Sequence, residues 1–185
     1  MPFITPAQSK TRDQFPLSPK KIIKKTVTGT IGYSILFLIL FVVSSIALLA
    51  TKNFSFVLLD GLIFLILLLA VLIAEYTYQK WYFTVYFYDL TESFIIIKKG
   101  VFTPKEISVP YERVQDIYMD QDIFDRFFGL YDAHISSATI SSGFEAHIDG
   151  VEKQAADGLK NLLLSTVQEK IKRAPHPQPQ PEQSK

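Results

Sequence analysis

The chain has 185 residues, of which 48% are hydrophobic and 20% are charged, and its formal net charge is +1 at pH 7. It contains no cysteine, which excludes disulfides, thiolate nucleophiles and metal sites with sulfur ligands. The apolar residues are not evenly spread, because the only charged side chains between Ile31 and Ala74 are Lys52 and Asp60. No soluble fold of this size needs so long an apolar stretch, so the sequence predicts an integral membrane protein.

The first 30 residues are basic. Their only acid is Asp13. Without an apolar pattern of its own, the segment 1–25 is predicted to be a disordered basic tail. The cationic residues in it are Lys10, Arg12, Lys20, Lys21, Lys24 and Lys25.

Residues 26–76 are predicted to form a transmembrane helical hairpin, with spans at about 31–50 and 54–74. A helix of about 20 residues is roughly 30 Å long, which matches the hydrocarbon core of a bilayer. The connection at 51–53 is short enough to make the two helices antiparallel neighbours. Because Lys and Arg are concentrated before the first span, we expect a multi-pass protein of the inner or plasma membrane with both termini in the cytoplasm. A cleaved signal peptide is not expected.

Asp60 is the intramembrane polar residue of this hairpin. Such acids are candidates for function. The simpler interpretation, which we favour, is that Asp60 reaches the outer interface or Lys52 across the turn. Ser44, Ser45 and Gly61 are small enough to let the two helices approach closely.

Residues 79–173 are predicted to form a small soluble domain. Aromatic and β-branched residues indicate strands, and Asp122 and Gly129 fit the two ends of a short helix. Pro110 marks a break between two strands. The predicted strands are 81–88, 93–99, 106–109 and 114–119, and the short helix is 122–128.

A further hairpin and a last helix follow. With a loop at 139–142, His134 faces His147, Ile135 faces Ala146 and Ala133 faces Ile148. Asp149 and Glu152 fit a capping box that opens an amphipathic helix ending near Arg173. The pattern predicts a small antiparallel sheet or partial barrel with a helix on its open side. The Pro- and Gln-rich segment 174–185 is predicted to be a disordered tail.

The order of short motifs resembles the bacterial pleckstrin-homology-like (PH-like, bPH2) domain of YdbS-like membrane proteins. The similar segments are Tyr88–Thr91, Ile95–Ile97, Gly100–Phe102, Val109–Ile117 and Arg126–Leu130. The resemblance implies a PH-like α+β fold, an antiparallel sheet capped by a C-terminal helix, behind the two-helix hairpin. It also implies a non-enzymatic protein, in a family with some members linked to cell-envelope stress or to peptide resistance. The motif residues expected to be structural are Leu90, Thr91, Gly100, Pro110, Arg113, Gln115, Arg126 and Gly129.

Catalytic chemistry has little support in the sequence. It contains no nucleophile elbow, phosphate-binding glycine loop or HExxH motif. The weak candidates for a metal site are His134 and His147, opposite each other in the predicted hairpin; the alternative is a polar solvent face. We therefore predict no enzyme, no catalytic residues, no resident metal and no cofactor.

Two interpretations of function stay open, and a metal-dependent enzyme that uses His134 and His147 is a distant third. In the first, the chain is a membrane-anchored interaction or scaffold module whose exposed sheet edges bind a protein partner or another copy. In the second, the domain senses an anionic lipid surface. The net negative charge of the domain argues against nucleic acid. The lysines assigned to the lipid surface are Lys98, Lys99 and Lys105, together with Lys20, Lys21, Lys24 and Lys25.

Overall fold

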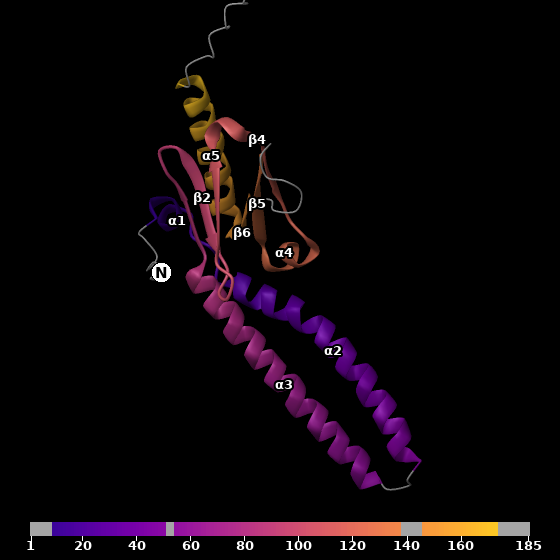
Figure 1. Cartoon of the computed structure of the whole chain (residues 1–185). Helices are drawn as coiled ribbons and strands as arrows, with labels where there is room; N and C mark the ends of the chain where they lie inside the picture. The colour runs from indigo at the N-terminus through magenta and orange to yellow at the C-terminus, as the bar shows by residue number, and fades with distance from the viewer. Residues whose placement is uncertain (1–8, 51–53, 138–145, 174–185) are drawn as a thin grey trace, which may run out of the picture.

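The computed structural model describes residues 9–50, 54–137 and 146–173. Helices α2 (Lys20–Leu49) and α3 (Phe54–Val85) run side by side as a hairpin from one end of a small domain (Figure 1). Both are long and apolar enough to cross a membrane, with mean hydropathies of 2.5 and 3.1 in their most apolar windows. None of the residues in those windows is buried inside the protein.

The two helices contact each other through aromatic and polar side chains. Phe64 packs edge-on against Phe41, with ring centroids 5.6 Å apart. Asp60 Oδ2 accepts hydrogen bonds from the hydroxyls of Ser44, at 2.8 Å, and Ser45, at 3.2 Å. Asp60 is thus bound to the neighbouring helix; Lys52, one of the two partners expected for it beside the outer interface, lies outside the described residues. The small residues Ser44 and Ser45 act as its donors.

The domain contains two three-stranded antiparallel sheets with strand orders β1-β2-β3 and β4-β5-β6. A 3-10 turn, η1, joins β3 to β4, and a short helix, α4, joins β4 to β5. The long C-terminal helix α5 packs on β4, β5 and β6. The bounds are β1 Phe87–Leu90, β2 Phe94–Lys99, β3 Lys105–Pro110, η1 Tyr111–Arg113, β4 Val114–Asp120, α4 Ile123–Phe128, β5 Leu130–Ser137, β6 Ala146–Glu152 and α5 Lys153–Arg173.

Several local predictions are confirmed. His134 pairs with His147, Ile135 with Ala146 and Ala133 with Ile148, as the hairpin register requires. Asp122 caps α4 through the backbone N–H of Asp125, and Gly129 ends it in the left-handed conformation with φ +68°. The apolar stripe of α5, including Leu159 and Leu163, lies in the core. The predicted loop at 139–142 lies outside the described residues, as does the tail at 174–185.

The first predicted strand is wrong over residues 81–85, which belong to helix α3. The aromatic residues that favour a strand here are spaced for a helix instead: Tyr78 contacts Tyr82, and Tyr82 contacts Tyr86 just past the helix end. Side chains four residues apart meet on a helix surface, so this run continues the helix to the edge of the domain. Only Phe87 and the residues after it enter the sheet.

The capping box predicted at the start of the last helix is also wrong. Asp149 and Glu152 lie in strand β6, and α5 begins after them at Lys153. The carboxylate of Asp149 is buried, and Lys21 and Tyr86 bind it. A side chain engaged in this way is not available to cap a helix.

The basic N-terminal segment is not disordered over residues 9–25, which corrects the predicted tail. Residues 9–19, which we call the N-terminal strap, include helix α1 (Lys10–Gln14). Ser9 donates a 2.7 Å hydrogen bond to the carbonyl oxygen of Tyr88 in β1. Leu17 bridges to Val151 in β6, and the Ser18 amide donates to the carbonyl of Gly150 at 2.8 Å. The strap therefore touches one outer strand of each sheet, β1 in the first and β6 in the second.

Substitution of Leu17 tests whether the strap is part of the folded domain. Leu17 is only 5% exposed and belongs to the hydrophobic core. We expect Leu17→Ala to lower the free energy of unfolding by about 2–3 kcal/mol, since it leaves a cavity in a packed interior. Denaturation of the full chain in detergent, followed by tyrosine and tryptophan fluorescence, measures the change.

Leu164→Ala is the matched control for this substitution, because Leu164 on α5 is 36% exposed. It should cost less than about 1 kcal/mol. Equal small effects of both substitutions would mean that the strap is not packed on the domain in solution.

Candidate functional site

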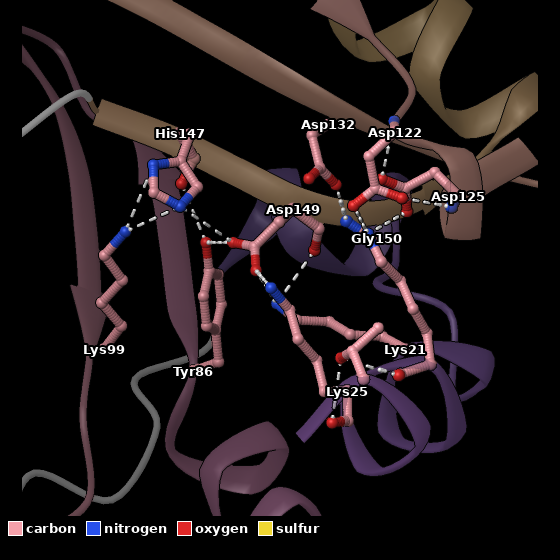
Figure 2. Close-up of polar contacts among 12 residues, drawn as sticks. Lys21, Lys25, Tyr86, Lys99, Asp122, Asp125, Asp132, His147, Asp149 and Gly150 are labelled. Atoms are coloured by element: carbon pink, nitrogen blue, oxygen red, sulfur yellow. Dashed lines mark hydrogen bonds and ion pairs between the residues drawn. The ribbon is translucent and has the colours of Figure 1, made fainter. Parts of the chain in front are cut away.

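The most polar part of the interior lies where α2 enters the domain. Lys21 is only 3% exposed, and its Nζ lies 3.0 Å from Asp149 Oδ2 (Figure 2). The same ammonium group donates to the backbone carbonyl of Asp149 at 3.0 Å and lies 3.8 Å from the centre of the Tyr86 ring. A buried ammonium needs such partners, because an unpaired charge in an apolar interior is strongly destabilising.

Tyr86 completes the environment of Asp149. Its hydroxyl donates to Asp149 Oδ1 at 2.7 Å and approaches the carbonyl of His147 at 2.9 Å. Burial and the neighbouring Asp149 raise the pKa of Tyr86 well above its ordinary value, so it remains a neutral donor. Burial alone would raise the pKa of Asp149, but Lys21 and Lys25 outweigh that effect and hold it well below its usual range. Asp149 is therefore an anion at neutral pH.

A second lysine of α2 binds the short helix α4. Lys24 Nζ lies 2.5 Å from Asp125 Oδ1 and 2.9 Å from Asp122 Oδ2. Lys24 is 3% exposed and Asp125 is 1% exposed, so this contact is also internal. We call the four contacts of Lys21 with Asp149 and Tyr86, and of Lys24 with Asp122 and Asp125, the lysine clasp. It fastens the first turns of α2 to both β6 and α4.

Asp132 is the carboxylate of this region whose charged form is unfavourable. Its carboxylate accepts a 2.7 Å hydrogen bond from the Gly150 amide, yet burial and the charges of Asp149 and Asp125 raise its pKa to about 6. Gly150 has φ +84°, and a Cβ there would lie 2.6 Å from Cδ of Lys21. The glycine lets the Lys21 stem pass close to the backbone of β6.

Next to the lysine clasp, two further lysines contact His147 and Asp149. Lys99 Nζ lies 3.2 Å from His147 Nε2, and Lys25 Nζ lies 3.8 Å from Asp149 Oδ2 (Figure 2). Burial lowers the pKa of Lys99; the charge of Asp149 opposes this, while Lys25 and Lys105 lower it further. Lys25, Lys99 and Lys105 thus lie close enough for their charges to interact, although they come from three different elements.

The structure divides the lysines assigned to a lipid surface. Lys21 and Lys24 are buried in the clasp and are not available to lipid, which corrects that assignment. Lys20 forms an ion pair with Glu152 at 3.1 Å, and Lys98 forms one with Glu106 at 3.1 Å. The electrostatically linked set is therefore Lys25, Lys99 and Lys105.

The two histidines of the predicted hairpin stack on each other. The rings of His134 and His147 have centroids 5.6 Å apart, and the other face of His134 stacks on Tyr118 at 4.8 Å. His134 Nε2 lies 3.1 Å from Asp120. Among the described residues, no group of three His, Asp or Glu side chains is arranged to hold a metal ion.

The residues of the family-like motifs lie mostly at turns. Thr91 Oγ1 accepts from the Phe94 amide at 3.1 Å, and the Thr91 carbonyl accepts from the Tyr111 hydroxyl at 2.7 Å. Gly100 has φ +105° at the turn after β2. The others lie at the end of β1 (Leu90), the end of β3 (Pro110), in η1 (Arg113), at the irregularity in β4 (Gln115), on α4 (Arg126) and after α4 (Gly129).

The clasp itself was missed by sequence reasoning. The run at 20–25 is typical of the basic flank of a membrane span, and its two pairs of lysines around a pair of isoleucines give no sign of which lysines are buried. Asp122 was found only as a helix cap, and Asp149 was assigned to the wrong element. The ion pairs of the clasp join residues more than 90 positions apart, which no local pattern encodes.

Two apolar helices followed by two small antiparallel sheets and a C-terminal helix define a PH-like domain on a helical hairpin, an arrangement that fits a small membrane protein. A model of the family described as "Bacterial PH domain" matches residues 26–167. The chain belongs to this family, whose fold is in general non-catalytic. Comparison with curated proteins and with solved structures gave no match. The strap, Lys21 and Lys24 precede the matched residues.

Asp149→Asn tests the buried ion pair. It keeps the shape of the side chain but leaves the Lys21 ammonium without an anion, so we expect a loss of about 3 kcal/mol in unfolding free energy at pH 7. Since the folded pKa of Asp149 is depressed, its contribution is complete above the unfolded value near 4 and declines below it. Denaturation of both proteins between pH 3.5 and 8 measures this, and Lys21→Met added to Asp149→Asn should recover part of the loss.

Asp132→Asn is a control that should change the free energy of unfolding in the opposite direction. The folded pKa of Asp132 is raised to about 6, so its ionised form is destabilising above that pH. Removing the charge should stabilise the protein by about 1–2 kcal/mol at pH 8, and the gain should vanish below about pH 4. If Asp149→Asn were as harmless as Asp132→Asn at neutral pH, the buried ion pair would not be present.

Proposed function

We propose that the protein is a membrane-anchored, non-enzymatic interaction module of the bacterial cell membrane, with both termini in the cytoplasm. The observation that carries this proposal is the lysine clasp. Because Lys21 and Lys24 are core residues of the domain and also lie in the first turns of α2, the domain is not a freely tethered unit. A partner bound to the domain would be held at a fixed position over the membrane surface.

The edges of the two sheets indicate where a partner can bind. The strap contacts β1 and β6, so these outer strands are partly occupied by the chain itself. Strands β3 and β4 are the other outer strands, and each pairs with a strand on one side only among the described residues. An added strand from a protein partner, or from a second copy, can pair along either of them; residues Lys105, Glu106 and Ser108 of β3 are exposed.

Single cysteines test the topology, because the chain has no native cysteine. We expect a membrane-impermeant maleimide added to intact bacterial cells with a permeable outer envelope to label Lys52→Cys but not Ser165→Cys on α5. Lysis should make Ser165→Cys reactive. Labelling of both sites, or of Ser165→Cys alone, in intact cells would overturn the proposed arrangement.

A second candidate function is recognition of an anionic lipid surface. It is favoured by Lys25 of α2, Lys99 of β2 and Lys105 of β3, whose charges interact. Lys99 and Lys105 flank the β2–β3 turn, which contacts α3 through Phe102. Each lysine close to an anionic membrane surface contributes about 1 kcal/mol of attraction.

The lipid interaction is testable in the full chain, since a fragment beginning at Gln79 would lack the lysines that neutralise Asp149 and Asp125. In nanodiscs at low salt, anionic lipid should raise the melting temperature of the domain by about 3–5 °C over neutral lipid, because a ligand of the folded state stabilises it. The increment should be lost in Lys99→Ala/Lys105→Ala and at high ionic strength.

Lys170→Ala/Lys172→Ala, near the C-terminal end of α5, is the matched control, as it removes the same charge from the end of the domain away from the hairpin (Figure 1). It should keep the increment. A melting temperature independent of lipid charge in all three proteins would eliminate the lipid function and leave a protein partner as the ligand.

A further inference from the structure

The three most exposed large hydrophobic side chains of the described residues belong to the domain and not to the hairpin. Ile123 and Phe127 on α4 are each 83% exposed, and Phe102 in the β2–β3 turn is 74% exposed. The most exposed large hydrophobic residue in α2 or α3 is Phe54, at 66%. Side chains of this size are costly to leave in water when they are gathered on one side of a domain.

Phe102 lies beside α3. Its ring stacks on Tyr78 with centroids 5.9 Å apart and packs edge-on against Trp81 at 5.7 Å. Trp81 is itself 52% exposed. It follows the apolar run that ends at Ala74 by seven residues, or about 10 Å along a helix. An aromatic cluster at this distance from an apolar span is typical of a membrane interface.

Ile123 and Phe127 belong to α4, the short helix next to α2. Helix α4 contacts α2 and is held there by the ion pairs of Lys24 with Asp122 and Asp125. Lys24 precedes the apolar run beginning at Ile31 by seven residues, again about 10 Å along the helix. The two apolar side chains are one turn apart and therefore on one face of α4, while Asp125 is buried.

The two protruding groups thus come from separate parts of the domain but lie at the same level along the hairpin. Both are at the end of the domain from which α2 and α3 extend (Figure 1). Tyr78, on which Phe102 stacks, is about 6 Å past Ala74 along the helix, which is within the polar interface that extends about 5–8 Å beyond the hydrocarbon. Trp81 and Lys24 lie at the outer edge of that layer, where interfacial helices bury their apolar face. Arg126, exposed on α4, supplies the cation that such helices place beside lipid phosphates.

We propose that the face made by Ile123, Phe127 and Phe102 docks in the headgroup–acyl boundary of the bilayer that α2 and α3 span. This inference rests on the proposed membrane anchoring. The occupant is lipid because the face continues the apolar surface of the two helices at the level where the bilayer surface lies. The lysine clasp then holds the domain close to the membrane, and the domain contacts lipid at two places, one beside each helix.

Depth-dependent quenching tests the docking in the full chain reconstituted in vesicles. Phe127→Cys and Phe102→Cys are labelled in turn with an environment-sensitive fluorophore, and lipids carrying a nitroxide high on the acyl chain are added. We expect the emission of each label to fall by roughly half, as for a group at the headgroup–acyl boundary. Ile171→Cys, at the far end of α5, is 47% exposed and should not be quenched.

Leu40→Cys, in the middle of α2, separates failure of the docking from failure of the anchoring. If the label at 40 is quenched by deep nitroxides while the labels at 127 and 102 behave like that at 171, the docking is overturned and the anchoring stands. If the label at 40 is not quenched either, both are overturned. A blue-shifted label at 127 that lipid nitroxides do not quench, and that depends on protein concentration, would assign this face to a second copy and also overturn the docking.

Discussion

The buried ion pair between Lys21 and Asp149 is the interaction on which the rest of the structure depends. Two opposite charges in an interior are stable only with close geometry and further hydrogen bonds, and here Tyr86 and the Asp149 carbonyl supply them. Satisfying that requirement fixes the rotation of α2 about its axis and its distance from β6. The direction in which the hairpin leaves the domain follows from the same contacts.

A buried ion pair is a costly way to join two parts of a protein, and an apolar contact would be at least as stable. Its value here lies in specificity. Helix α2 carries exposed isoleucine, valine and leucine side chains along most of its length, so an apolar joint would have many alternative registers. A lysine that must reach one carboxylate allows one register, in the same way that a buried polar residue fixes the register of a coiled coil.

The sequence was sufficient for those features that depend on local or periodic patterns. The two long apolar helices, the caps of α4 and the register of His134 with His147 all follow from composition, capping preferences and alternation along a strand. The errors arose where tertiary contacts override a local pattern. The aromatic run after Tyr78 has strand composition, but its contacts with Phe102 and with its own next turn favour a helix. Likewise, Asp149 has the spacing of a cap but is bound to Lys21.

The lysines before the first span show why the candidate site could be only partly predicted. By sequence they are equivalent cations next to a membrane, and the rule that orients spans counts them together. In the fold they differ: Lys21 and Lys24 are internal, while Lys25 is 39% exposed beside Lys99. The 100° step between successive helix residues separates them, since it places 21 and 24 on the face toward the domain and 25 at its edge. A single basic cluster therefore divides between two environments: Lys21 and Lys24 are buried and fasten the domain, while the neighbouring Lys25 is partly exposed.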